Sequence, residues 1–100
     1  MRVEFAEPAA RDLEEIVDYI ALDSPSAAEP VFRAIVAATE RLREFPRLGH
    51  PGRLPQTREL SVVSLPYLIV YEVTADALTI LAVFHGARDL VRASRERRGE

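Results

Sequence analysis

Two stretches near the N-terminus place apolar residues at the spacing of amphipathic helices. In residues 7–20 the apolar side chains recur three or four positions apart, and the other face is acidic. Residues 25–45 repeat the spacing, and Asp23-Ser24-Pro25-Ser26 separates the two patterns. Glu7-Pro8 favours a helix start, because proline suits the first helical position and a carboxylate suits the positive end of the helix dipole. The short joint predicts an antiparallel helical hairpin.

Pro30 lies inside the second helical pattern. A proline in a helix interior removes one backbone hydrogen bond, and its ring crowds the preceding turn. We therefore expect a distorted or 3₁₀ start to this helix. Phe45-Pro46 ends it, because the residue before a proline is biased away from the helical region.

Four further segments have the pattern of strands. Residues 2–6 alternate and residues 58–63 alternate weakly, whereas residues 67–73 and 78–85 are almost continuously apolar. Thr74–Ala77 is short enough for a hairpin, and Leu48–Gly52 forms a turn-rich loop. Strict alternation in the last strand puts Leu78, Ile80, Ala82 and Phe84 on one side and Thr79, Leu81, Val83 and His85 on the other.

The predicted order is β-α-α-β-β-β in a single domain spanning residues 1–100. This is an α+β fold: an N-terminal strand, then an antiparallel helical hairpin packed on one face of a mostly antiparallel sheet. Residues 88–98 predict a short basic C-terminal helix or tail. Both sides of the last strand are apolar, so the face away from the helices needs a cover, and a bound partner is one candidate.

Composition narrows the function classes. The chain has no cysteine, which excludes a disulfide scaffold, a thiolate metal site and a cysteine nucleophile. Two histidines without ligand spacing predict no metal site, and no cofactor is expected. No apolar run reaches the ~20 residues of a membrane span, and the N-terminus lacks a signal-peptide pattern, so we expect a cytoplasmic protein.

The net charge of −3 is unevenly distributed, with the acidic excess in residues 1–46 and a small basic excess in residues 47–100. All thirteen basic residues are arginine. This mild balance argues against a general nucleic-acid binder, for which a strongly basic domain is expected. Each guanidinium is nevertheless a planar fork suited to a carboxylate or a phosphate.

A series of short motifs resembles the ParE/RelE superfamily of toxins, over nearly the whole chain. The motifs are Leu42–Pro46, Gly49–Arg53, Thr57–Leu60, Tyr67–Tyr71 and Val83–Asp89, after a first helix with Asp12 and Tyr19-Ile20. The chain is more similar to the ParE branch. The resemblance implies the toxin of a bacterial type II toxin–antitoxin system (plasmid stabilisation type). The resemblance also implies a ParD-like antitoxin that forms a hetero-oligomer with the toxin. In this complex the antitoxin would contact DNA, and the toxin would not.

The two branches imply different activities. ParE-type toxins are associated with inhibition of DNA gyrase, and RelE-type toxins cleave messenger RNA on the ribosome. An RNA-cleaving site needs a base, an acid and a cation around one phosphate, and the candidates for it here are Arg58, His85 and Arg88. RelE-type enzymes cluster Lys and Arg and place a Tyr in the C-terminal segment, whereas this chain has no Lys and has Ser94 there.

We therefore favour a non-enzymatic gyrase inhibitor over a ribosome-dependent endoribonuclease. A non-toxic module that only binds an antitoxin is a third hypothesis. The candidate antitoxin- or target-binding residues are Arg53, Arg58, Arg88, Arg92 and Arg95.

Each candidate also has a purely structural interpretation. Arg58 can form an ion pair with Glu59 or Glu72, and His85 can hold the end of its strand. His50 fits a solvated loop, and Tyr67 and Tyr71 fit the core.

Overall fold

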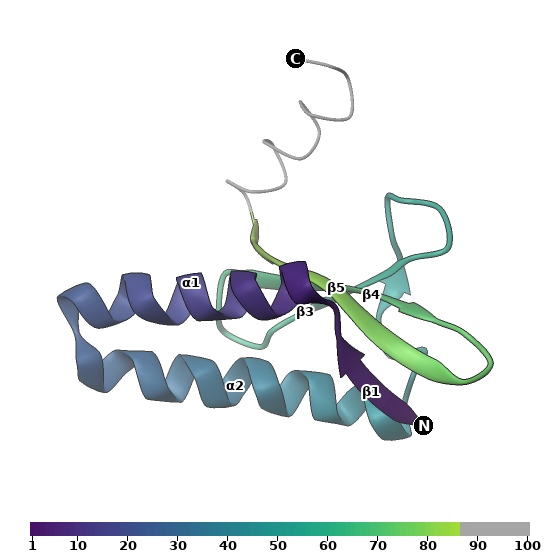
Figure 1. Ribbon diagram of the computed structural model, residues 1–100, viewed down its shortest axis with the longest axis horizontal. Coiled ribbons are helices and arrows are strands. Elements are labelled where there is room, and N and C mark those ends of the chain that lie inside the picture. The colour runs from purple at the N-terminus through teal and green to yellow at the C-terminus, as the bar shows by residue number, and fades with distance from the viewer. Residues whose placement is uncertain (87–100) are drawn as a thin grey trace, which may run out of the picture.

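The computed structural model describes residues 1–86 (Figure 1). The predicted basic helix or tail at 88–98 lies outside these residues. The elements are β1 (Arg2–Phe5), α1 (Glu7–Asp23), α2 (Pro25–Glu44), β2 (His50–Pro51), β3 (Arg58–Ser61), β4 (Tyr67–Val73) and β5 (Ala77–His85). The predicted α+β order is confirmed, with one addition: a two-residue strand, β2, lies in the segment expected to be a turn-rich loop.

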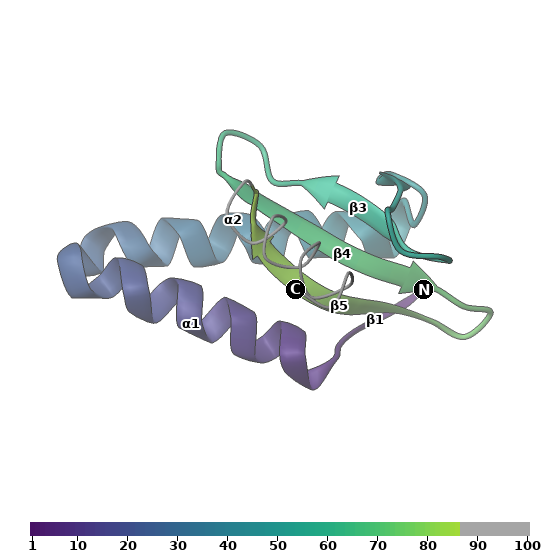
Figure 2. The same ribbon diagram turned by 90° about the horizontal axis from the view of Figure 1, so that it is seen from above.

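The five strands form one mixed sheet in the order β1-β5-β4-β3-β2. β1 runs parallel to β5, and the other neighbours are antiparallel. The helical hairpin packs on one side of this sheet, and its joint projects beyond the strands (Figures 1 and 2). Neither helix is long and apolar enough to cross a membrane.

The core lies between the helical hairpin and the three strands β3, β4 and β5. Apolar positions spaced three or four apart on each helix meet apolar positions of the central strands. The buried cluster consists of Ala9, Leu13, Ile35, Leu42, Val62, Ile69, Tyr71, Leu78, Ile80 and Val83. The two edges of the sheet, β1 and β2, are largely exposed, whereas β3 lies between β4 and β2.

A β-bulge in β5 changes which residues face the helices. Val70 pairs with Ala82 but Tyr71 pairs with Ile80, so Leu81 is an extra residue. An extra residue reverses the alternation beyond it. Val83 is therefore 2% exposed in the core beside Ile80, and the predicted grouping of Ala82 and Phe84 with Leu78 and Ile80 is wrong.

The second helix is α-helical from Pro25 to Glu44, so the predicted 3₁₀ start is wrong. Pro30 is exposed and removes one hydrogen bond from the helix. Ala28 and Ile35 are buried on the opposite face. Most helical stability in proteins comes from packing of the apolar face, and this packing outweighs the single lost bond.

Candidate functional site

Tyr71 ties the segment after α2 to the sheet. Its side chain is fully buried, which confirms the interpretation as a core residue. The Tyr71 hydroxyl accepts a hydrogen bond from the Gly49 N–H at 2.9 Å and donates one to the Pro46 carbonyl at 2.9 Å. A Cβ at position 49 would lie 2.7 Å from the Glu59 carbonyl oxygen, so only glycine allows this close approach. The loop is thus held in one position above the edge of the sheet.

Arg58 is fixed by the same loop. Its Nε donates to the Gly49 carbonyl at 2.9 Å and its Nη2 donates to the Arg47 carbonyl at 3.4 Å. Arg58 pairs with Tyr71 across β3 and β4, so it lies on the helix side of the sheet. The expected ion pair with Glu59 or Glu72 is absent among the described residues, because successive strand residues point to opposite faces.

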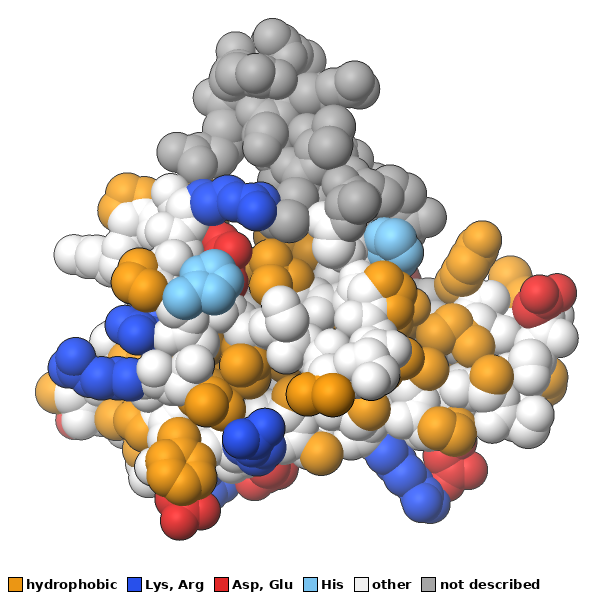
Figure 3. All heavy atoms as spheres, turned by 180° about the vertical axis from the view of Figure 1, so that it is seen from behind, with side chains coloured by type: hydrophobic (Ala, Val, Ile, Leu, Met, Phe, Trp, Pro, Cys, Tyr) orange, Lys and Arg blue, Asp and Glu red, His pale blue; other side chains and the backbone are white. Residues whose placement is uncertain are grey.

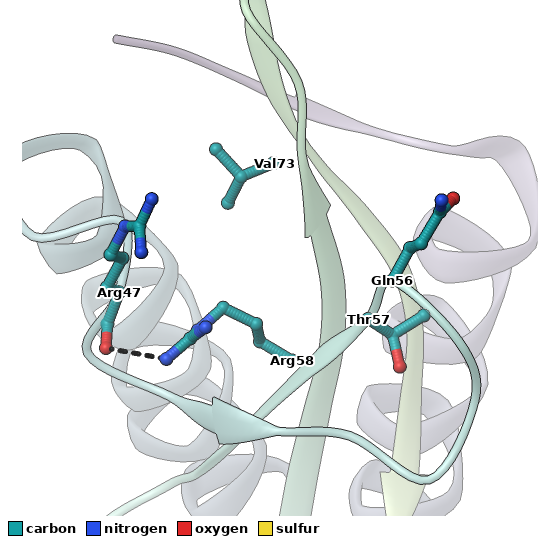
Figure 4. A pocket seen from close by; sticks show the side chains of 5 residues that line it. All are labelled: Arg47, Gln56, Thr57, Arg58 and Val73. Atoms are coloured by element: carbon teal, nitrogen blue, oxygen red, sulfur yellow. Dashed lines mark hydrogen bonds between the residues drawn. The ribbon is translucent and has the colours of Figure 1, made fainter.

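A pocket of about 230 Å³ opens beside Arg58 and is lined by Arg47, Gln56, Thr57, Arg58 and Val73. Figure 4 shows the Arg58 guanidinium directed at the Arg47 backbone carbonyl and the Arg47 side chain extending away from that contact toward the side of Val73, with Gln56 and Thr57 on the far side. Within residues 1–86, no carboxylate oxygen lies within 4.0 Å of either guanidinium. The pocket therefore presents two cations without a compensating anion from the described chain.

The opposite face of the sheet carries a second pocket, of about 310 Å³, whose polar lining includes His50, Arg53 and Glu59. Glu59 is only 5% exposed, and its Oε2 accepts a hydrogen bond from the Arg53 backbone N–H at 3.0 Å. His50 faces Glu59 across β2 and β3. Sequence reasoning treated Glu59 only as an ion-pair partner and His50 as a solvated loop residue. The alternation of residues 58–61 could have predicted that the Glu59 and Arg58 side chains lie on opposite faces of the sheet.

His85 lies at the other end of the sheet from Arg58. Its ring meets the Tyr67 ring edge-to-face, with centroids 5.8 Å apart. His85 pairs with Tyr67 and Arg58 pairs with Tyr71, four positions further along β4. At ~3.3 Å per residue this separates them by roughly 13 Å along the strand.

The sequence-predicted site residues therefore do not converge. Arg58 lies on the helix side, Arg53 beside the pocket on the opposite face, and His85 at the far end of β4. Arg88, Arg92 and Arg95 lie outside the described residues. No three potential ligands among His, Asp and Glu gather into a metal-binding group within residues 1–86.

Four other arginines in residues 1–86 form ion pairs on the surface. The ion pairs are Arg2–Glu4, Arg11–Glu7, Arg33–Glu29 and Arg43–Glu40. A hydrogen bond from Arg43 and its positive charge lower the pKa of Glu40. Figure 3 shows the Arg side chains on the far side of the molecule as separate groups rather than a continuous basic strip.

Comparison with known proteins identifies the family. The family model for the ParE toxin of the type II toxin–antitoxin system parDE matches residues 3–90 of this chain. The chain belongs to the ParE toxin family. It is therefore a type II toxin of the ParE/RelE superfamily, as the resemblance implied.

Two named relatives resemble this ParE-family chain, and one of them carries a RelE name. Y4kP, a candidate toxin of Sinorhizobium fredii, is 42% identical over 84 residues, which cover 84% of this chain and 86% of that protein. Toxin RelE2 of Caulobacter vibrioides is 38% identical over 80 residues, which cover 80% of this chain and 89% of that protein. The family membership therefore leaves gyrase inhibition and RNA cleavage both open.

The fold matches that of a solved toxin–antitoxin system. A chain of the chromosomal ParDE system of Pseudomonas aeruginosa has a TM-score of 0.78 and 26% identity, covering 86% of this chain and 96% of that one. This similarity supports an antitoxin as the partner of the ParE-family chain.

Proposed function

We propose that this ParE-family toxin is neutralised by a ParD-like antitoxin and inhibits DNA gyrase by binding it in the cytoplasm, without cleaving RNA. One observation carries the choice against cleavage: Arg58 and His85 lie roughly 13 Å apart along β4. A general base, a general acid and a phosphate-binding cation must all lie within hydrogen-bond reach of one reacting group. The described part of the predicted catalytic set is too widely spread for this.

The chemistry of the sheet face away from the helices also supports binding over cleavage. The polar group buried there is the Glu59 carboxylate, and Leu68 lies beside it in the same pocket. Within the pocket lining the Glu59 carboxylate offsets the Arg53 guanidinium, whereas a phosphate needs an excess of positive charge or hydrogen-bond donors. The absence of lysine from the whole chain removes one common source of that charge.

Exposed apolar side chains on the helical hairpin support a protein partner. Tyr19 is 70% exposed and Leu22 is 86% exposed, both near the projecting joint. Phe32, Val17 and Ala10 line a shallow groove of about 240 Å³ between the two helices. Apolar surface gathered in this way is typical of protein–protein contact sites.

A supercoiling assay tests the proposal. Purified toxin should block gyrase-catalysed supercoiling, and addition of the antitoxin encoded beside the toxin gene should restore it. Full gyrase activity with excess folded toxin would contradict the gyrase proposal.

Growth inhibition on expression without the antitoxin separates a toxin from a non-toxic binding module. In that growth assay, unchanged toxicity of both Arg58→Ala and Arg88→Ala would remove these arginines from the site.

The second candidate is ribosome-dependent RNA cleavage, which the pocket holding His50, Arg53 and Glu59 favours. A histidine, an arginine and a carboxylate are the residue types that general acid–base cleavage of RNA uses. Cleaved messages on toxin-loaded ribosomes, lost in Glu59→Gln and His50→Ala, would support it. Intact messages with the wild-type toxin would count against it.

A further inference from the structure

We propose that the pocket between Arg47 and Arg58 is a carboxylate-binding site that takes one acidic side chain of the antitoxin. The inference rests on the proposed antitoxin partner and adds to it the chemistry of one contact. It concerns the pocket lined by Arg47, Gln56, Thr57, Arg58 and Val73, which we call the arginine pocket.

The first argument is that Arg58 is held in place before any ligand binds. Two of its guanidinium nitrogens donate to the Gly49 and Arg47 carbonyls, and the loop that carries these carbonyls is fixed by Tyr71. The remaining N–H groups of the planar fork are left for an outside acceptor. A pre-positioned arginine loses little side-chain entropy when it binds a carboxylate, so the contact gains affinity.

The second argument is that the pocket concentrates uncompensated positive charge. Figure 4 shows the Arg47 and Arg58 guanidinium groups on the same side of the pocket as Val73, whereas Gln56 and Thr57 lie on the far side. Thr57 donates its hydroxyl to the Leu54 carbonyl at 2.7 Å. Two cations with no carboxylate within 4.0 Å in residues 1–86 attract an anion, and charge-assisted bonds to a carboxylate are the strong ones.

The third argument selects a protein carboxylate over a nucleic-acid phosphate. Val73 forms an apolar wall and is 38% exposed, so it can pack against the methylene groups of an acidic side chain or its neighbour. Nucleic-acid binding needs several phosphate contacts along a basic strip, whereas the chain carries a net charge of −3 and the arginines of residues 1–86 visible in Figure 3 form separate groups. A single anion beside an apolar residue fits an acidic segment of a protein.

The test is the affinity of the full-length toxin for the antitoxin encoded beside its gene, measured by titration calorimetry. Arg47→Gln should weaken binding by about tenfold or more, because a close charge pair at an interface is lost. Arg47 uses only its backbone carbonyl in the fold, so this variant should fold normally. Arg41→Gln makes the same charge change on the exposed surface of α2, outside the pocket, and should stay within about twofold.

A second pair of variants fills the pocket from within. Val73→Asp places a carboxylate beside both arginines and should weaken antitoxin binding by about tenfold or more. Val73→Asn has the same shape without the charge and should have a clearly smaller effect. Single Asp-to-Asn and Glu-to-Gln changes in the antitoxin would then identify the bound side chain. The change at that side chain should weaken binding to the wild-type toxin but should not weaken binding to Arg47→Gln any further.

The outcomes separate the two proposals. Wild-type binding with no effect of Arg47→Gln or Val73→Asp overturns the arginine pocket and leaves the antitoxin proposal intact. Loss of binding to single-stranded RNA in Arg47→Gln, with antitoxin affinity unchanged, also overturns it in favour of a phosphate. No binding of the wild-type toxin to the antitoxin contradicts the proposed partner itself.

Discussion

Single side chains decide how the loop between α2 and β3 is held. Tyr71 satisfies both a donor and an acceptor of this loop with one hydroxyl. The loop in turn supplies the carbonyls that position Arg58. The orientation of the arginine pocket therefore depends on a core residue that would not contact the bound partner.

Tyr71→Phe tests this dependence. The change leaves the Gly49 N–H and the Pro46 carbonyl without their partner, which should cost about 1–3 kcal/mol of unfolding free energy. Urea denaturation measures the loss. Tyr19→Phe removes a hydroxyl from an exposed position, and its stability should stay within about 0.5 kcal/mol of the wild type. Equal stabilities for the two variants would contradict the bridging role of Tyr71.

The contacts of Arg58 mark the limit of prediction from residue types. Neighbouring carboxylates in the sequence suggested an ion pair, and alternation along β3 places Glu59 on the other face instead. The actual acceptors are backbone carbonyls nine and eleven positions away in the chain. Such partners depend on how a loop folds back, and no local pattern encodes that. Strand alternation alone could have separated the two faces.

At the scale of elements, the two helices were predictable because their apolar residues repeat over several turns. The exception was Pro30, whose local effect was overestimated because burial of the opposite helix face decides the outcome. The two-residue β2 has too few residues to form a pattern, and it exists only because β3 offers a paired edge.

Replacement of Pro30 should reveal its remaining cost. Pro30→Ala restores a backbone donor and removes the ring from the helix interior, so stability should rise by roughly 1–3 kcal/mol. Thermal and urea unfolding measure the gain. Pro25→Ala is the matched control, because Pro25 is the first residue of α2, where proline is favourable. If Pro25→Ala stabilised the protein as much as Pro30→Ala, the position of Pro30 inside the helix would not be the cause of the lost stability.

The bulge in β5 is the element that strict alternation could not predict, since one extra residue reverses every later position. Asp12 of α1 contacts the strand just past this bulge: its Oδ2 accepts the Val83 N–H at 3.0 Å. The helix thereby supports the irregular stretch of the strand.

Asp12→Ala should destabilise the protein by about 1–3 kcal/mol, because the Val83 N–H loses its acceptor. Asp12→Asn keeps a side-chain carbonyl and should lose less. Hydrogen exchange at the Val83 amide, together with urea denaturation, reports both effects. Unchanged exchange in Asp12→Ala would show that Asp12 does not hold the bulge.

The whole molecule combines a thin core with an exposed helical hairpin. A domain of this size buries a modest share of its surface, so a partner that binds only the folded state adds substantially to stability. At an antitoxin concentration one hundred times its Kd the gain is about 2.7 kcal/mol. For a domain of this length that corresponds to a melting temperature about 10 °C higher or more.

Differential scanning fluorimetry of the toxin with increasing antitoxin checks this expectation. The melting temperature should keep rising with the logarithm of the antitoxin concentration, and the increase should be smaller for Arg47→Gln. An antitoxin that binds but leaves the melting temperature unchanged would mean that it binds the unfolded chain equally well.

The parallel pairing of β1 with β5 has a consequence for the order of events during protein synthesis. Arg2 pairs with Ala77, which the ribosome adds 75 residues later. At ~5–20 residues per second, the first strand waits roughly 4–15 s for its neighbour. During this interval the helical hairpin can form from local contacts, but the sheet that carries Arg58 cannot close. A nascent toxin therefore lacks both the closed sheet and the arginine pocket until the ribosome has added β5.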